Sequence, residues 1–165
     1  MAFFKFDGNI PNDWVVSFQN FENRYIAKIL SYYQKSATQI KITDGQHLNN
    51  PLLHDSNNPL QFYIHKDEVY FIFSENDIPL SSTQREALIA HEIGHWIYNN
   101  SELKDQELEE ACDQVAVILD ISSDLKEALT ILKDHLSKNL ELLSCSLQIN
   151  PQSTIKALEK RIEKL

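Results

Sequence analysis

Two histidines and one glutamate near the middle of the chain have a spacing that suits a metal site. His91, Glu92 and His95 occur in the order H-E-x-x-H. On an α-helix, residues four positions apart lie on one face about one turn from each other, so both imidazoles can face one metal ion while Glu92 lies beside it. The pattern predicts the active site of a zinc hydrolase, in which the glutamate accepts a proton from water.

The motif lies in a segment with the pattern of a helix, which we expect over residues 83–100. Pro79 precedes this segment, and Ser81 and Gln84 have the spacing of a capping box. Apolar residues recur at helical intervals within it: Leu88, Ile89, Ile93 and Ile97. The two histidines are therefore expected on the secondary structure that their spacing requires.

Two imidazoles are an incomplete ligand set, because catalytic zinc takes three protein ligands and leaves a fourth position for water. A second helix is expected over residues 107–119, and its start is acidic: Glu107, Glu109, Glu110 and Asp113. If the chain reverses over residues 101–106, this helix crosses the first one near the metal. We choose Glu109 as the third ligand. Asp113 lies four residues later on the same face, where it can accept the free N–H of a ligating histidine.

The sequence HEIGH followed by ELEEACDQVAVIL resembles the gluzincin metallopeptidases. It is most similar to the family of the CAAX prenyl proteases and the bacterial heat-shock membrane metallopeptidase, and to their small soluble relatives, the minigluzincins. In that family a second helix bears E-x-x-x-D, which Glu109 and Asp113 match, while Cys112 replaces the usual alanine. The resemblance implies that the zinc ligands are His91, His95 and Glu109. It also implies that Glu92 is the general base and that Asp113 supports one of the ligands.

The resemblance covers residues 60–165 and has limits. The aromatic hairpin before the motif resembles the substrate-edge strand of the family, and residues 149–165 look like the segment that closes many of its catalytic domains. Its best-known members have transmembrane helices, whereas the apolar runs of this chain are too short to span a bilayer. The gap from His95 to Glu109 is short for the family, which leaves Glu110 as an alternative ligand. The regulatory ImmA/IrrE-like metallopeptidases also have H-E-x-x-H followed by an acidic helix, so the chain resembles this second group as well.

The remaining patterns predict a single α+β domain over residues 1–165. Residues 1–13 are expected to be irregular, and residues 44–59 to form a polar loop. A helix over residues 14–33 should bury its apolar positions: Val15, Phe18, Phe21, Tyr25, Ile29 and Tyr32. We further expect a strand at 39–43, a hairpin of strands at 61–65 and 68–74, and helices at 125–136 and 154–165. The expected fold is a zincin-like metallopeptidase core, with a small antiparallel or mixed sheet packed on the N-terminal, motif and C-terminal helices.

Composition restricts the partners. The net charge is −9, from 24 acidic and 15 basic residues, which disfavours binding to nucleic acid or to anionic lipid. Cys112 and Cys145 make no disulfide framework, and the N-terminal residues lack the pattern of a secretory signal. We expect a cytoplasmic protein without membrane insertion that acts on a peptide or protein substrate. The oligomeric state is left open.

The leading functional hypothesis is a zinc-dependent endopeptidase that hydrolyses peptide bonds, with Glu92 as general base and Zn²⁺ as cofactor. Iron or manganese would fit the same ligands less selectively. Three residues are candidate donors to the reaction intermediate by residue type: His65, Tyr98 and His135. The strand at 68–74 is a candidate site for strand addition by an extended peptide. The alternative is a non-catalytic or latent regulatory zinc-binding module of the ImmA/IrrE-like type, acting through a protein partner.

Overall fold

A mixed sheet and a group of helices make up the part of the chain that the structure describes. The structure is a computed structural model, and it describes residues 2–44, 58–74, 77–139 and 151–165. The strands are β1 (Phe4–Asp7), β2 (Ile40–Thr43), β3 (Leu60–His65) and β4 (Glu68–Phe73). They form a four-stranded sheet in the order β1-β2-β4-β3, in which β3 and β4 are antiparallel and the other pairs are parallel. The α+β class and the hairpin predicted from the sequence are confirmed at this level.

The hairpin has the tight connection that its sequence suggests. Lys66 and Asp67 join β3 to β4, and both have positive φ, at 49° and 64°. Two successive residues with positive φ match the right-handed twist of the flanking strands. Within β2, Ile40 and Ile42 are fully buried, as expected for alternating apolar residues that face a core.

The prediction that residues 1–13 are irregular was wrong, because β1 lies within this segment. Phe4 is paired with Ile40 of β2, and Phe3 and Phe4 are buried. The carboxylate of Glu22 accepts hydrogen bonds from the backbone N–H groups of both phenylalanines, at 2.8 and 3.3 Å. Gly8, at φ 91°, ends the strand. The turn-forming residues therefore act only after β1, whose apolar side chains complete the sheet.

The N-terminal helix is interrupted by a π-helical segment. Its parts are α1 (Asn12–Phe21), the π segment (Glu22–Ile26) and α2 (Ala27–Tyr33). Phe18 and Phe21 are fully buried, as predicted. Tyr32 is 61% exposed, so its predicted burial was wrong. The π segment adds a residue per turn and rotates the later positions around the axis.

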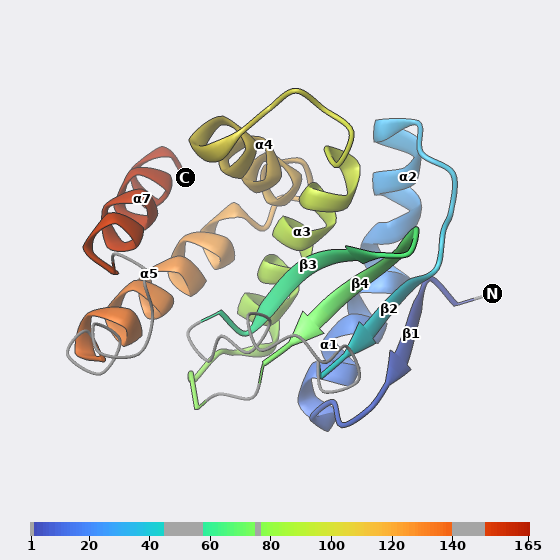
Figure 1. The fold of residues 1–165 in the computed structure, drawn as a ribbon, viewed down its shortest axis with the longest axis horizontal. Helices are drawn as coiled ribbons and strands as arrows, with labels where there is room; N and C mark the ends of the chain where they lie inside the picture. Colours follow the sequence, from blue (N-terminus) through green and yellow to red (C-terminus); the bar gives the residue numbers. More distant parts are fainter. Residues whose placement is uncertain (1, 45–57, 75–76, 140–150) are drawn as a thin grey trace.

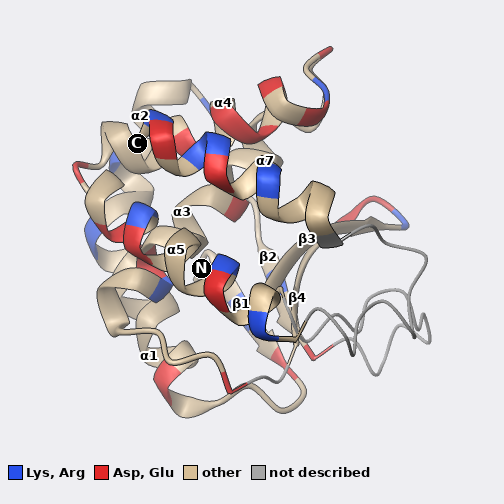
Figure 2. Cartoon of the chain, turned by 90° about the vertical axis from the view of Figure 1, so that its left-hand side faces the viewer, with Lys and Arg blue, Asp and Glu red and all other residues tan. Residues whose placement is uncertain are grey.

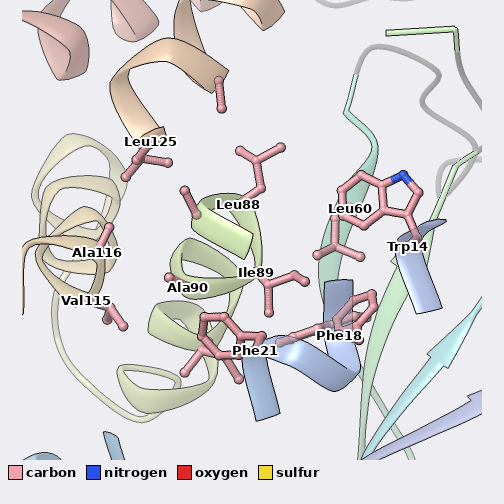
Figure 3. Packing of buried hydrophobic residues seen from close by; sticks show 14 of the residues in the cluster. Trp14, Phe18, Phe21, Leu60, Leu88, Ile89, Ala90, Val115, Ala116 and Leu125 are labelled. Atoms are coloured by element: carbon pink, nitrogen blue, oxygen red, sulfur yellow. The ribbon is translucent and has the colours of Figure 1, made fainter. Parts of the chain in front are cut away.

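Helix α3 (Ser82–Ile97) carries the H-E-x-x-H motif through the centre of the fold. Its capping box is present, because Ser81 Oγ accepts the N–H of Gln84 at 3.2 Å and the side chain of Gln84 accepts the N–H of Ser81 at 2.9 Å. Helix α3 contacts α1, α4, α5 and β3. Figure 3 shows Ile89 directed toward the aromatic rings of α1, with Leu125 of α5 above Leu88. These contacts bury most of the helix, including His91 and Glu92.

Three further helices lie on the side of α3 that is away from the sheet (Figure 1). They are α4 (Asp105–Ile118), α5 (Ser122–Lys138) and α7 (Pro151–Lys164). The predicted apolar face of α5 is buried: Leu125, Ala128, Leu129, Leu132 and Leu136. Helix α7 begins three residues before its predicted start, at a proline, which suits the first turn of a helix. Most of the predicted loop at 44–59 lies outside the described residues. Among the helices that the structure describes, none is long and apolar enough to span a membrane.

Candidate metal centre

A close crossing of α3 and α4 determines where the centre lies. The two helices approach each other at Gly94 and Cys112, where a Cβ atom added to Gly94 would lie 2.5 Å from the Cα of Cys112. Only glycine leaves room for this approach. Cys112 is fully buried, and burial raises the pKa of its thiol, which disfavours the thiolate that would bind a metal. The crossing brings the motif of α3 next to the acidic first half of α4.

The three residues predicted as zinc ligands have their donor atoms close together. The Nε2 atoms of His91 and His95 are 3.2 Å apart. The carboxylate of Glu109 spans both, with Oε2 at 3.2 Å from His91 Nε2 and Oε1 at 3.3 Å from His95 Nε2. Tetrahedral zinc with bonds of about 2.0–2.1 Å holds neighbouring donor atoms about 3.3 Å apart. The spacing of these three residues therefore fits one zinc ion.

Glu92 belongs to the same cluster. One ligand atom from each of His91, Glu92 and His95 can be chosen so that all three lie within 4.8 Å of one another. Glu92 is buried, and burial raises the pKa of its carboxyl, while the neighbouring imidazoles offset part of this effect. A carboxylate with a raised pKa accepts a proton more readily near neutral pH.

His91 is oriented through its second ring nitrogen. Its Nδ1 lies 2.8 Å from Oδ1 of Asp113, which is 3% exposed. When Nδ1 donates its proton to this carboxylate, Nε2 is the ring nitrogen that can bind a metal, and it lies on the side of His95 and Glu109. The contact predicted for Asp113 is thus present. It is the contact expected for a carboxylate that supports a metal-binding histidine.

Arg161, on α7, is the site residue that the sequence analysis missed. Its Nε and Nη2 donate to the two carboxylate oxygens of Asp113 at 2.8 and 2.7 Å, and its Nη1 lies 3.1 Å from Glu109 Oε2. Arg161 is only 7% exposed. A signal exists in the sequence, because Arg161 follows Leu158 by three residues and so shares the apolar face of α7. A cation in an apolar stripe calls for a buried anion.

The surroundings of His91 both lower and raise the pKa of its imidazole. Burial and the nearby Arg161 lower the pKa of His91, but hydrogen bonds with Asp113 and Glu109 raise it more, to about 9. Burial raises the pKa of Glu109 and of Asp113, yet their contacts with the histidines and Arg161 hold both pKa values below the ordinary range. Both carboxylates are therefore ionised at neutral pH, which favours a divalent cation.

His95 is held differently, by a contact with the sheet. Its ring stacks on that of Phe62 in β3, with the centroids 6.1 Å apart and the planes 15° from parallel. The ring of Phe62 restricts the rotation of His95 and lies at the edge strand of the sheet. The outer strand of the hairpin thereby contacts the centre directly.

The remaining candidates have their contacts elsewhere. Glu110, the alternative third ligand, pairs with Lys164 and accepts a hydrogen bond from Gln106, whereas Glu109 contacts the histidines. The three candidate donors contact other side chains: His65 stacks on Tyr63, Tyr98 packs on Tyr33, and His135 lies 3.3 Å from Asn139. The structure therefore favours Glu109 over Glu110 and selects none of the three donors.

Comparisons with known proteins were made at the level of families, sequences and structures. No protein-family model, curated protein or solved structure matches the chain. A functional assignment therefore depends on the contacts within the site.

Proposed function

We propose that the protein is a zinc-dependent metallopeptidase with a zincin-like core. The observation that carries this proposal is the triangle of donor atoms from His91, His95 and Glu109, with Glu92 next to it. Two imidazoles and one carboxylate are a catalytic zinc set, since they leave a coordination position for water or substrate. Glu92 follows a ligand directly, where a general base is required.

In the proposed reaction, the side chains hold the reactants and move one proton. Zinc, when bound, would polarise the peptide carbonyl and make water more acidic. Glu92 accepts a proton from the attacking water and passes it to the leaving nitrogen. Asp113 keeps Nδ1 of His91 protonated, so that Nε2 remains a ligand throughout. The burial of Glu92 excludes bulk water, which would otherwise compete for the proton.

We propose β3, rather than the strand at residues 68–74 suggested by the sequence, as the site for an extended peptide. The sequence suggested residues 68–74, but β4 lies inside the sheet between β2 and β3, so its backbone groups are already paired. Among the described residues, β1 and β3 are the edge strands, and it is β3 whose Phe62 stacks on His95. A peptide paired with β3 would run beside the metal centre, since an edge offers main-chain hydrogen bonds to any sequence.

The proposal is tested by measuring metal content and hydrolysis together. Purified protein should contain about one zinc per chain by elemental mass spectrometry, and His95→Ala and Glu109→Ala should both lose it. Glu110→Ala is the matched control, because Glu110 pairs with Lys164, and it should keep zinc. The native chain should also cleave a mixed peptide pool. Zinc retained with no cleavage would favour the regulatory module instead, and no zinc at all would end the metallopeptidase proposal.

A further inference from the structure

Helix α7 reaches the metal centre with one buried cation. Arg161 makes two hydrogen bonds to Asp113 and an ion pair with Glu109, so it joins a predicted ligand to the residue that orients His91. Lys164, one turn further on, is exposed and pairs with Glu110. Figure 2 looks onto α7, with an acidic part of α4 beside it. The attachment of α7 to α4 is thus largely ionic, and its buried member is Arg161.

The apolar attachment of α7 is small. Of the side chains described in this helix, Leu158 is the one buried hydrophobic residue, while Ile155, Ile162 and Leu165 are partly buried. Helix α3 buries far more apolar surface: Ala87, Ile89, Ala90 and Ile93 are fully buried. Elements with few buried apolar contacts open locally at a lower free energy than the core. Helix α7 also packs on α5, and its small buried apolar surface means that it can open locally at a lower free energy than α3.

The centre holds more acidic side chains than guanidinium groups. Glu92, Glu109 and Asp113 supply three carboxyl groups, and Arg161 supplies one guanidinium. This excess of acidic groups suits a divalent cation. Without Arg161, Asp113 would be buried without its cation, and the orientation of His91 would no longer be fixed.

We propose that α7 is a clip whose docking through Arg161 and the binding of zinc stabilise each other. This inference rests on the zinc centre of the proposed function. Docking of α7 fixes Asp113 and hence the ligand atom of His91, so it raises the affinity for zinc. By linkage, zinc must favour the docked position of α7 by the same factor. Arg161 is a positioning residue in this scheme, because it contacts Asp113, Glu109 and the Nδ1 atom of His91, which is not the nitrogen proposed as a ligand.

Hydrogen exchange of the full-length native protein tests the linkage directly. Exchange is followed by mass spectrometry in the chelator-treated and in the zinc-saturated protein. Peptides from α7 should exchange at least about tenfold more slowly with zinc, whereas peptides from α1, which supplies no residue to the centre, should change less than about twofold. An equal slowing of α1 and α7 would mean general stabilisation and would overturn the clip. No change in α7 while zinc binds would do the same.

Two substitutions on the same helix give a matched comparison. Arg161→Met removes the cation that faces the centre, and Lys164→Met removes a cation that contacts only Glu110 among the acidic residues described. In competition with a fluorescent chelator, R161M should weaken zinc binding at least about tenfold and K164M less than about twofold. Arg161→Lys should be intermediate, because it keeps the charge but loses the two-point contact with Asp113.

The outcomes separate this inference from the function on which it rests. If R161M folds, by circular dichroism, and binds zinc as tightly as K164M, Arg161 has only a structural role and the clip is wrong. If R161M does not fold, the exchange experiment on the native protein still decides. Zinc binding by the native chain without a selective effect on α7 overturns the clip alone. Absence of zinc binding by the native chain overturns both proposals.

Discussion

At the scale of single residues, the proposal of an enzyme rather than a metal site without turnover depends on Glu92. It is buried beside the two histidines, and the contacts that hold the centre together come instead from Glu109, Asp113 and Arg161. A carboxylate with a raised pKa next to a proposed ligand has a clear use as a proton acceptor. A site that only stores or senses zinc has no chemical need for it.

Glu92→Gln should abolish hydrolysis and leave the metal in place. The amide has nearly the same shape as the carboxylate but cannot accept a proton, so peptide cleavage should fall about 10²- to 10⁴-fold. Cleavage of a peptide pool and zinc content are measured on the same sample. Glu107→Gln, at an exposed position of α4, is the control and should match the native rate. Undiminished cleavage by zinc-loaded E92Q would show that another group moves the proton.

Burial of a second glutamate on α3 predicts that the stability of the fold depends on pH. Glu86 is 3% exposed, and burial raises the pKa of its carboxyl, while Arg24 at 3.4 Å offsets part of this. A folded-state pKa above the unfolded one means that stability falls as pH rises through the folded-state value. Glu86→Gln should therefore raise Tm by a few degrees at pH 7, with the gain disappearing near pH 4. A gain of equal size at both pH values would exclude ionisation of Glu86 as the cause.

At the scale of elements, the crossing of α3 and α4 is the contact on which the ligand set depends. Glu109 and Asp113 reach the histidines because Gly94 lets the helices approach at Cys112. The small size of both residues is therefore a requirement of the site, although neither takes part in the chemistry. The exposed residues of α4 are free of this constraint.

Gly94→Ala should separate the two helices and weaken the metal centre. The added Cβ meets the backbone of Cys112, which cannot rotate away as a flexible side chain would. We expect unfolding to become easier by about 1–3 kcal/mol, with a loss of zinc affinity larger than tenfold. Cys112→Ala removes only the sulfur and should keep zinc affinity within about threefold. Thermal unfolding and chelator competition measure both quantities, and native-like zinc binding by G94A would contradict this account of the crossing.

Helices and their caps were predictable because their signals are local. The capping box of Ser81 and Gln84, the hairpin turn and the placement of Glu109 and Asp113 on one face of α4 all depend on residues a few positions apart. Arg161 lies 48 residues from Asp113, so no local pattern joins them. Strand β1 was missed for the same reason, because its partner β2 lies far along the chain. The position of β4 inside the sheet was also not predictable, because it depends on pairing with β2.

At the scale of the whole molecule, the centre joins elements from distant parts of the chain. Its residues come from α3, α4 and α7, and Phe62 adds the edge of the sheet. An ion held by the predicted ligands of both α3 and α4 would bind the folded state far better than the unfolded chain. Zinc should therefore stabilise the whole fold by mass action.

Zinc at about 1,000 times its dissociation constant should stabilise the fold by about 4 kcal/mol, which corresponds to ~10 °C in Tm for a chain of this length. Differential scanning fluorimetry over a zinc titration measures this shift. Magnesium is the control ion, because it prefers oxygen ligands and should leave Tm unchanged at a site with two imidazoles. His95→Ala is the control chain and should shift by less than about 2 °C. A zinc shift that persists in H95A would place the stabilising ion elsewhere, because the stabilisation would then not depend on the triangle of His91, His95 and Glu109.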